Sequence, residues 1–420
     1  MIYFFIYKRV KEGIMRTAGI ICEYNPFHTG HKRQIDILHG MGYDCVVCVM
    51  SGNYTQRGEL ALFDKYTRAK SAVLGGADIV LELPFPYSSF SAEGFASSGV
   101  LILASLGVEA ICFGSECGDI SLLEIAADAL LRGDFSDIYS KHVKCGRGSA
   151  AAYFDAIAEI TGRDISLLSN DILGISYVAA IKRENYKLDI LPIKREGAAY
   201  NEKELKIGIM PSASAIRECI KNRAENLKPL LGGHIPDLSL DCLLNAKNQG
   251  LALVLAENIG AEILSFFKLM SPKEIEDRAI SRSGDGDKIA EDGCGICESL
   301  CNTAHQSGTY GEFLKRSYTA KYPDSRINRV ILFSILGVSD RLSHSVPEYT
   351  TLLAANGSGR EFLSHIRKMG GFTVVTKPAD APEGTLQRKI SDCADSLYSR
   401  AIPSKKSEDF FIKSRPYILK

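Results

Sequence analysis

Two histidines lie three positions apart directly after the first apolar segment of the chain. This loop reads Glu23-Tyr-Asn-Pro-Phe-His-Thr-Gly-His31, and its core from His28 to His31 is an H-x-G-H motif. Pro26 stiffens the turn, and Gly30 allows the backbone to approach a ligand closely. At the start of a following helix, free N–H groups and the helix dipole attract anions. Two imidazoles there can donate hydrogen bonds to phosphate oxygens and stabilise a pentavalent transition state; packing or helix capping is the alternative role.

The segments around this motif alternate between short apolar runs and helix-like stretches. Buried strands are predicted at residues 17–22, 44–50, 78–83, 109–113 and 187–192. Apolar positions recur at helical spacing in residues 31–40, 63–75, 93–107 and 212–222, which predicts helices there. Apolar strands separated by helices pair in parallel through right-handed crossovers, so we predict an α/β fold with a doubly wound parallel sheet. Ligands bind beyond the carboxyl ends of such strands, and the H-x-G-H motif follows one of these ends.

The composition excludes several classes of protein. Among 420 residues, 50 are basic and 50 are acidic, so any binding of nucleic acid must come from local patches. No apolar run reaches the ~18 residues that span a bilayer, which excludes an integral membrane protein. The twelve cysteines are scattered along the chain, a pattern typical of free thiols in a reducing cytosol. We therefore expect a cytoplasmic protein.

The pattern of the sequence changes near residues 226–237, where prolines and glycines cluster: strand-like apolar runs become fewer after it and helical patterns become longer. We predict a catalytic α/β domain over residues 15–230 and a mostly α-helical domain over residues 238–420. Residues 1–14 are interpreted as an extension upstream of a natural start at Met15, because the first clear strand follows directly.

The H-x-G-H loop after a first strand resembles the nucleotidyltransferase superfamily, whose members transfer a nucleotidyl group and release pyrophosphate. A second element of that superfamily is a turn rich in serine or threonine that ends in Ile-Arg before a helix. The segment Ser212-Ala-Ser-Ala-Ile-Arg217 is similar to it but offers fewer hydroxyl groups, because alanines stand at positions 213 and 215. The resemblance implies that the serines and Arg217 reach the β- and γ-phosphates. Plain N-capping by serine is the alternative.

Successive motifs narrow the resemblance to the tRNA(Met) cytidine acetate ligase family. Their order over residues 15 to about 220 matches that family, in the strings GIICEYNPFHTGH, VMSGNYTQRGE, GADIVLELP, FGSECGD, SNDILGISY and PIKREGAAYNE. A looser likeness continues through residues 315–336 and 356–360. The implied fold is a nucleotidyltransferase-like variant of the Rossmann fold.

The resemblance implies a two-step, ATP-dependent ligase that modifies tRNA. Acetate would attack the α-phosphate of ATP and give acetyl-adenylate and pyrophosphate. The exocyclic amine of the wobble cytidine of elongator tRNA(Met) would then take the acetyl group, giving N4-acetylcytidine. Such chemistry depends on positioning and charge stabilisation, and it needs neither acetyl-CoA nor a covalent enzyme intermediate. Mg²⁺ is expected to accompany ATP, and no carboxylate cage dedicated to it is visible in the sequence.

The resemblance also implies which residues contact the nucleotide. His28 and His31 would be the catalytic pair on the phosphates. The ATP-binding stretch of the family corresponds to Ile21, Cys22, Glu23, Tyr24, Asn25, Pro26, Phe27, His28, Thr29, Gly30, His31, Lys32, Arg33 and Gln34. Further contacts correspond to Gly114, Asn170 and Arg195. Asp171 stands where a second Asn is expected, and because an acidic group there would weaken phosphate binding, we favour Asn170.

A basic segment with interleaved tyrosines is the candidate contact to RNA. It contains Tyr318 and Tyr322 among Lys315, Arg316, Lys321, Arg326 and Arg329. Cations on phosphates and aromatic rings on bases are the usual chemistry of RNA recognition, and a solvated helix face is the alternative. In the loop after the second predicted strand, Gln56 and Arg57 are either part of a structural turn or contacts to a substrate.

The cysteines are predicted to have packing roles. Cys45 and Cys48 lie three apart in a predicted strand, so their side chains leave opposite faces and cannot share a metal ion. An intact helix would spread a second group over about 16 Å, too far for one ion; this group is Cys294, Cys297, Cys301 and His305. We therefore predict a buried seam of thiols and no metal site. The charged, glycine-rich residues 281–293 before them are predicted to be a loop.

Two other functions stay open on the sequence alone. A small-molecule nucleotidyltransferase that makes a coenzyme precursor from ATP would share the first domain but leave the residues after 238 without a role. A tRNA-binding protein with an inactive nucleotide site is disfavoured by the intact His28, His31 and Arg195. The three functions differ in substrates, because the ligase needs acetate and tRNA, the coenzyme enzyme ignores tRNA, and the binding protein consumes no ATP.

Overall fold

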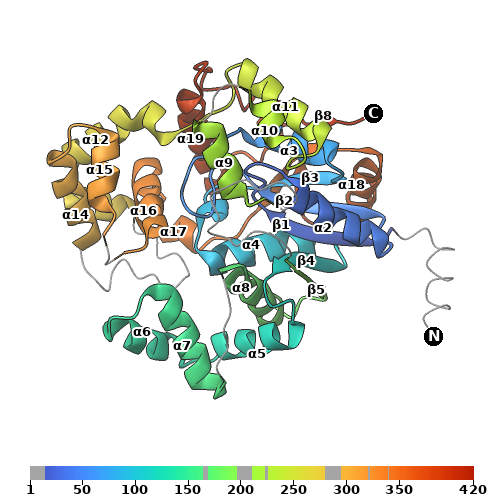
Figure 1. The fold of residues 1–420 in the computed structure, drawn as a ribbon, viewed down its shortest axis with the longest axis horizontal. Helices are drawn as coiled ribbons and strands as arrows, with labels where there is room; N and C mark the ends of the chain where they lie inside the picture. Colours follow the sequence, from blue (N-terminus) through green and yellow to red (C-terminus); the bar gives the residue numbers. More distant parts are fainter. Residues whose placement is uncertain are drawn as a thin grey trace.

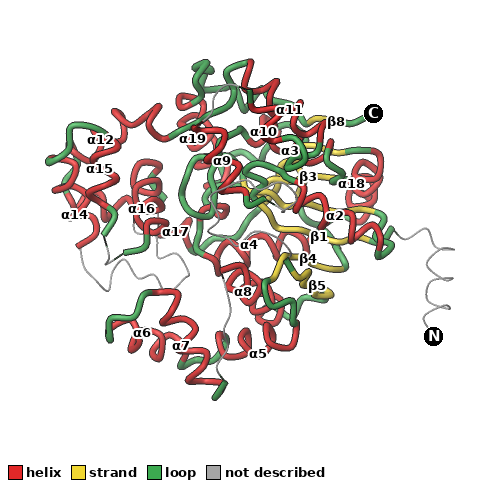
Figure 2. Tube along the Cα trace, viewed as in Figure 1, coloured by secondary structure: helices red, strands yellow, loops and turns green. Residues whose placement is uncertain are grey.

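A mostly parallel sheet with helices on both faces forms the centre of the molecule (Figures 1 and 2). The computed structural model describes residues 15–163, 169–195, 211–222, 226–279, 295–319, 322–338 and 340–420. Several sequence-based expectations lie outside the described residues, namely those for residues 1–14 and 281–293, for Cys294 and for Lys321.

Within the described residues, the sheet has eight strands. In chain order these are β1 (Thr17–Cys22), β2 (Cys45–Ser51), β3 (Ile79–Leu83), β4 (Ala110–Ser115), β5 (Asp189–Lys194), β6 (Tyr349–Ala355), β7 (Thr373–Val375) and β8 (Tyr417–Ile418). Across the sheet the order is β5-β4-β1-β2-β3-β6-β7, and β8 also pairs with β6. The first five strands run parallel, and β6 pairs with β3 in the antiparallel direction. The predicted doubly wound parallel sheet is confirmed.

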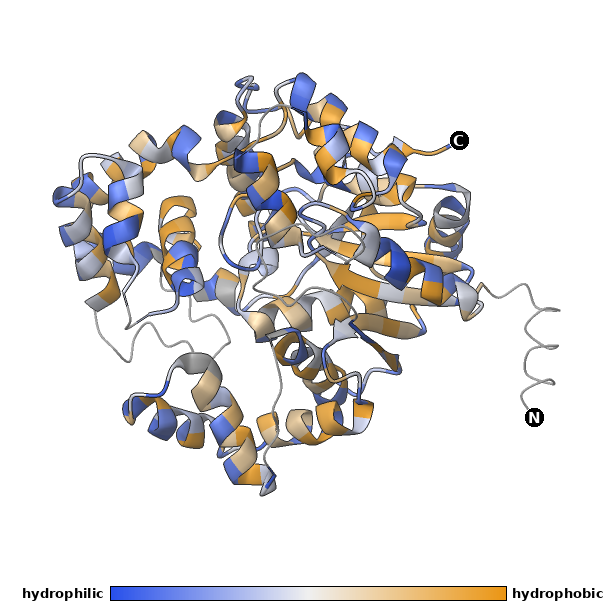
Figure 3. Cartoon of the chain, in the orientation of Figure 1, coloured by the Kyte–Doolittle hydropathy of each residue, from blue (hydrophilic) through white to orange (hydrophobic). Residues whose placement is uncertain are grey.

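Helices bury both faces of the sheet, which explains why its central strands are apolar at almost every position. Val46 and Cys48 of β2 face α2 (Thr29–Gly40) and α3 (Lys65–Leu74), whereas Cys45 and Val47 face the opposite side. That side is covered by α4 (Ala92–Ser105), α8 (Ser169–Arg183) and α18 (Gly357–Met369). Figure 3 shows the strands as a hydrophobic layer between these helices. Cys45 and Cys48 point to opposite faces, as predicted.

The remaining helices flank this core. They are α5 (Ile120–Leu130), α6 (Phe135–Lys144), α7 (Ser149–Thr161), α9 (Ala213–Asn222), α10 (Leu227–Leu231), α11 (Asp237–Asn248), α12 (Gly260–Leu269), α13 (Pro272–Ala279), α14 (Gly295–His305), α15 (Tyr310–Ser317), α16 (Asp324–Leu336), α17 (Asp340–Ser343) and α19 (Leu386–Ala401). Helices α12 to α16 pack on one another at one side of the sheet, on the left of Figure 1. Among the described residues, no helix is both long and apolar enough to cross a bilayer.

Three strands of the central sheet come from the last quarter of the chain, which the sequence analysis had assigned to a mostly helical part. All seven residues of β6 are buried, and the strand lies beside β3. The run Tyr-Thr-Thr-Leu-Leu-Ala-Ala is too short to distinguish a buried strand from a buried helix by periodicity. Because these strands extend the sheet of residues 15–230, the core is continuous between the two parts. The domain boundary near residue 230 stays a prediction.

A buried ion cluster joins the first helices of the chain to the last one. The ammonium group of Lys65, at the start of α3, donates to Glu82 Oε1 of β3 at 2.7 Å and to Asp395 Oδ2 of α19 at 2.6 Å. Burial by itself lowers the pKa of Lys65, but the two carboxylates outweigh this effect and raise the pKa above its ordinary value. The lysine therefore stays charged and links segments that are 330 residues apart.

We predict that Lys65→Met lowers the free energy of unfolding by about 3–5 kcal/mol, because it leaves two carboxylates without their cation in a buried place. Urea denaturation followed by circular dichroism measures this change. The matched control is Lys182→Met, which removes an exposed ion pair with Asp128 and should cost less than about 1 kcal/mol. Equal losses in the two variants would contradict the structural importance of the cluster.

Candidate active site

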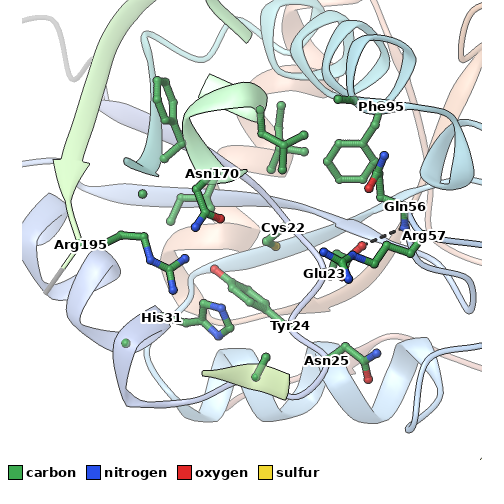
Figure 4. Close-up of a pocket in the computed structure, with 18 of the residues that line it drawn as sticks. Cys22, Glu23, Tyr24, Asn25, His31, Gln56, Arg57, Phe95, Asn170 and Arg195 are labelled. Carbon is green, nitrogen blue, oxygen red and sulfur yellow. Dashed lines mark hydrogen bonds between the residues drawn. The ribbon is translucent and has the colours of Figure 1, made fainter. Parts of the chain in front are cut away.

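A cavity of about 860 Å³ opens at the carboxyl ends of β1 and β4. The loop after β1, the end of β4, the starts of α8 and α9, and residues after β2 and β5 contribute to its wall. Figure 4 shows His31 and Arg195 at one side, Gln56 and Arg57 at the other, and Tyr24 between them. The cavity therefore lies where a doubly wound sheet binds its ligands.

Most of the residues predicted to contact a nucleotide line this cavity. They are Ile21, Cys22, Glu23, Tyr24, Asn25, His28, Gly30, His31, Arg33, Gln34, Gly114, Asn170 and Arg195. The structure places four others of the predicted stretch outside the lining, namely Pro26, Phe27, Thr29 and Lys32. The lining describes geometry only, and the roles of these residues in binding stay proposals.

Three of the residues outside the lining have contacts away from the cavity. Phe27 is fully buried against Gly75, where an added Cβ would lie 2.1 Å from the ring. The backbone N–H of Thr29 donates to the carbonyl of His234. Lys32 pairs with Asp36 on the exposed side of α2. Residues at i and i+4 are neighbours on a helix surface, so Lys32 pairs with Asp36 there and not with a group in the cavity.

His28 and His31 cap the N-terminus of α2 through one nitrogen each. His28 Nδ1 accepts from the N–H of Gly30 at 3.1 Å, and His31 Nδ1 accepts from the N–H of His28 at 3.3 Å. The two rings stack with centroids 3.7 Å apart. The alternative capping role is therefore present in the structure, but it occupies only the Nδ1 atoms. In a neutral imidazole whose Nδ1 accepts, the proton is on Nε2, which leaves two N–H donors for a ligand.

Both imidazoles are held neutral. Burial lowers the pKa of His28 to about 3, and the nearby guanidinium groups of Arg195 and Arg217 act in the same direction. Burial also lowers the pKa of His31 well below its ordinary value, with His28 and Arg195 adding to the effect. Neutral rings with protonated Nε2 atoms donate to phosphate oxygens without the desolvation cost of burying two more cations.

The segment that resembles the second element of the superfamily adds a cation to the end of the cavity near His28 and His31. Arg217 of α9 lines the cavity and donates to the carbonyl of Asn25 at 2.8 Å. Ser212 caps the helix by accepting from the N–H of Ala215, and Ser214 accepts from Arg217. The structure thus supports the capping alternative for Ser212 and brings Arg217 to the histidines.

A buried arginine positions the loops that form the cavity. Arg68 of α3 is fully buried, and its guanidinium group donates to the backbone carbonyls of Glu23, Ser51, Gly52 and Phe63. These carbonyls belong to the chain after β1, to the last residue of β2 and to the chain after β2. One side chain therefore links the H-x-G-H loop to its neighbour, and nothing in its local sequence predicts this role.

At the start of α8, Asn170 and Asp171 have different environments, and the preference for Asn170 as a nucleotide contact stays a prediction. Asn170 lines the cavity and donates to the carboxylate of Glu116. Asp171 is buried outside the lining, where it accepts from Ser115 Oγ at 2.5 Å and from the N–H of Glu116 at 3.0 Å. The carboxylate at the position expected to hold a second Asn therefore holds the turn at the end of β4 and does not line the cavity.

The opposite end of the cavity is formed by Glu23, by residues of the loop after β2 and by residues from the C-terminal half of the chain. Glu23 accepts from the N–H of Gln56 at 2.8 Å (Figure 4), and both residues line the cavity with Arg57 and Glu59. Further lining residues come from the end of α15 and the first turns of α16, namely Tyr318, Asp324, Ser325 and Asn328. Tyr318 had been noted only as part of the basic segment. No signal in the sequence relates it to the H-x-G-H loop, because some 290 residues separate them.

Two thiols of the predicted seam are part of the hydrophobic core. Cys297 and Cys301 of α14 are buried in the same cluster as Phe267 and Phe313. Their packing role is confirmed. His305 ends the same helix at an exposed position.

Comparisons with known proteins agree with this geometry. The family described as HIGH Nucleotidyl Transferase matches residues 15–410. A tRNA(Met) cytidine acetate ligase of Acetivibrio thermocellus is 34% identical over 394 residues, which cover 90% of this chain and 92% of the relative. The protein of the same name from Thermosipho africanus is 33% identical, and the match covers 87% of this chain and 85% of the relative.

Solved structures show the same fold. The crystal structure of Thermotoga maritima TmcAL without ligand superposes with a TM-score of 0.83 at 29% identity, covering 96% of this chain and all of that one. The structure of that protein bound with alpha-thio ATP superposes with a TM-score of 0.81 at 28% identity, again covering 96% of this chain. The order of motifs, the sheet and the full-length matches agree, so the chain belongs to the tRNA(Met) cytidine acetate ligase family of HIGH nucleotidyl transferases.

Proposed function

We propose that this protein is an ATP-dependent ligase that activates acetate as acetyl-adenylate and transfers the acetyl group to the exocyclic amine of the wobble cytidine of elongator tRNA(Met). One observation carries the proposal: two neutral imidazoles and two guanidinium groups converge in a cavity at the carboxyl ends of the strands. Relatives that carry the ligase name match this chain over nearly its whole length. The reaction takes place in the cytoplasm, where tRNA is modified.

The cationic end of the cavity is suited to the triphosphate. The Nε2–H groups of His28 and His31 donate to phosphate oxygens, and Arg195 and Arg217 balance their charge. The acetate oxygen attacks the α-phosphorus, and the bond from that phosphorus to the β-phosphate oxygen breaks. Preorganised donors stabilise the added charge of the transition state without reorganising solvent.

The middle of the cavity is suited to the nucleoside. Gly114 has no side chain, and Asn170 offers an amide beside it. Apolar side chains form the surrounding wall, namely Phe95, Phe113, Ile172, Leu173 and Tyr177. Apolar walls with a few polar groups are the usual composition of a site for a flat heteroaromatic ring. The structure of Thermotoga maritima TmcAL bound with alpha-thio ATP supports a nucleotide as a ligand of this fold.

Mg²⁺ is proposed to enter with the phosphates of ATP. Within the described parts of the chain, no three His, Cys, Asp or Glu side chains are arranged to hold a metal ion. This fits a cation that is held mainly by phosphate oxygens and water, as Mg²⁺ usually is. Bound there, it would neutralise charge on the leaving pyrophosphate.

The cavity wall also argues against the coenzyme-forming alternative. Tyr318 and Asn328, from the part of the chain that this alternative leaves without a role, line the same cavity as His28. A second substrate that approaches from the C-terminal half therefore reaches the nucleotide directly. A tRNA is such a substrate, and the exposed Lys315 and Arg316 lie just before Tyr318.

A transfer assay tests the proposed function. The purified full chain receives ATP, Mg²⁺, radiolabelled acetate and bulk bacterial tRNA, and acid-precipitable label is counted. We expect label in one tRNA species, and only when ATP is present. Pyrophosphate release that needs another acceptor and ignores tRNA would instead support the coenzyme-forming enzyme.

We predict that His28→Asn abolishes ATP consumption and leaves stability within about 0.5 kcal/mol of the wild type. The Asn oxygen replaces Nδ1 as the helix cap, but Asn has no donor where Nε2–H lies. His28→Ala removes both functions and should also lower the free energy of unfolding by ~1 kcal/mol. Pyrophosphate release and urea denaturation measure the two effects.

The matched control is His365→Asn, at an exposed position of α18. It should change neither quantity. If His28→Asn consumed ATP at the wild-type rate, the imidazole would be a cap and nothing more.

The exposed cations of α15 are predicted to bind the tRNA backbone. The double variant Lys315→Ala and Arg316→Ala should weaken tRNA binding and reduce the slope of log K against log salt by about 2, one for each lost phosphate contact. Filter binding at several salt concentrations measures the slope. The control is Lys187→Ala. Lys187 is exposed and lies just before β5, at the end of the strand that is remote from the cavity, so its loss should leave the salt slope unchanged. An unchanged slope in the double variant would exclude α15 from the RNA surface.

A further inference from the structure

The two ends of the cavity differ in charge. Around His28 and His31 the charged groups are guanidinium groups, from Arg195 and Arg217, which attract a polyphosphate. At the other end, Arg57 is accompanied by three carboxylates, namely those of Glu23, Glu59 and Asp324. Carboxylates repel phosphates and accept hydrogen bonds from amines. This end is therefore suited to a neutral group that carries an N–H donor.

One wall of this acidic end is an aromatic ring beside an amide. The hydroxyl of Tyr318 donates to Asn328 Oδ1 at 2.9 Å, and both side chains are half-buried and line the cavity. Because Oδ1 accepts from the tyrosine, the amide is oriented and its Nδ2 keeps two hydrogens for a further acceptor. The ring and the amide together form a surface of the kind that binds an unstacked base.

The loop after β2 holds this wall in place. At Gly58, φ is +73° and an added Cβ would lie 2.6 Å from the backbone nitrogen of Arg329, so the loop packs directly on α16. The neighbouring residues Arg57 and Glu59 are exposed, as is Asp324. The acidic end therefore reaches the molecular surface, where a nucleotide of an RNA loop can enter from outside.

We propose that Tyr318 and Asn328 form the subsite for the base that is acetylated. The inference rests on the proposed function and deepens it. The ring of Tyr318 stacks on the cytosine, and the Nδ2–H groups of Asn328 donate to its N3 and O2 acceptors. Uracil presents an N3–H donor in place of the N3 acceptor, so the oriented amide favours cytosine. The exocyclic amine then points toward the carboxylates and the acetyl-adenylate.

The chemical step balances with these groups. The amine nitrogen forms a bond to the acetyl carbonyl carbon, and the bond from this carbon to the phosphate oxygen breaks. AMP leaves with the electron pair, and a carboxylate of the acidic end accepts the proton that the amine loses. Tyr318 and Asn328 contribute by holding the base, so their loss should affect the second half-reaction only.

Two half-reactions separate this role from others. Hydroxylamine traps acetyl-adenylate as acetohydroxamate in the absence of tRNA, and transfer is measured with labelled acetate and tRNA. Asn328→Asp still accepts from the hydroxyl of Tyr318 but has no N–H donors. We expect it to lower kcat/KM for tRNA at least 10-fold and to leave hydroxamate formation within 2-fold of the wild type. Tyr318→Leu should also lower transfer about 10-fold, and Tyr318→Phe, which keeps the ring, should lower it less.

The control for the change of chemical group is Asn302→Asp, at an exposed position of α14. It should leave both half-reactions unchanged. Hydroxamate formation also reports that each variant is folded, so a loss of transfer alone supports the subsite.

Other results would overturn the inference. Transfer at the wild-type rate in Asn328→Asp and Tyr318→Leu would show that the pair only joins α15 to α16. Equal losses in both half-reactions would place the residues in the nucleotide site. A wild-type protein that forms hydroxamate but labels no tRNA would instead contradict the proposed function itself, and the subsite with it.

Discussion

The geometry of the site depends on the hydrogen bonds that the buried guanidinium group of Arg68 donates to backbone carbonyls. A parallel sheet delivers several loops to one edge, but the loops themselves have few backbone partners there. Arg68 donates to the carbonyls of Glu23, Ser51, Gly52 and Phe63, so a single planar group fixes the chain after β1 relative to the chain after β2. A lysine could not replace it, because an ammonium group lacks the five donors in one plane.

Helix α3, which contains Arg68, also binds the last helix of the chain, α19. Lys65, one turn before Arg68 on α3, binds Glu82 and Asp395, and α19 in turn accepts from Tyr54 through the carbonyl of Ala394. The loop after β2 is thus held between α3 and α19. Its tip packs on α16, which brings the C-terminal half of the chain to the mouth of the cavity. Rigid support of this kind is what a site that works by positioning requires.

The two histidines use one nitrogen each for structure. The Nδ1 atoms cap α2, and both residues line the cavity, so the Nε2–H groups are available for the proposed contacts to phosphate. Burial keeps both rings neutral in the absence of phosphate, so the protein does not have to stabilise four adjacent cations. The residues that cap α2 are therefore the same residues that are proposed to contact the phosphates.

The sequence by itself determined the parallel sheet, the H-x-G-H loop at the end of β1 and the preference for Asn170, because these depend on local periodicity, turn chemistry and the order of motifs. It did not reveal that β6 joins the sheet, since a seven-residue apolar run has no period that separates strand from helix. The positions of Arg68, Asp171 and the pair Tyr318 and Asn328 around the cavity were decided by tertiary structure alone. Arg68 binds the carbonyl of Glu23, 45 residues away, Asp171 binds Ser115, 56 residues away, and Tyr318 lines one cavity with His28. Side-chain contacts over such separations leave no local pattern in a single chain.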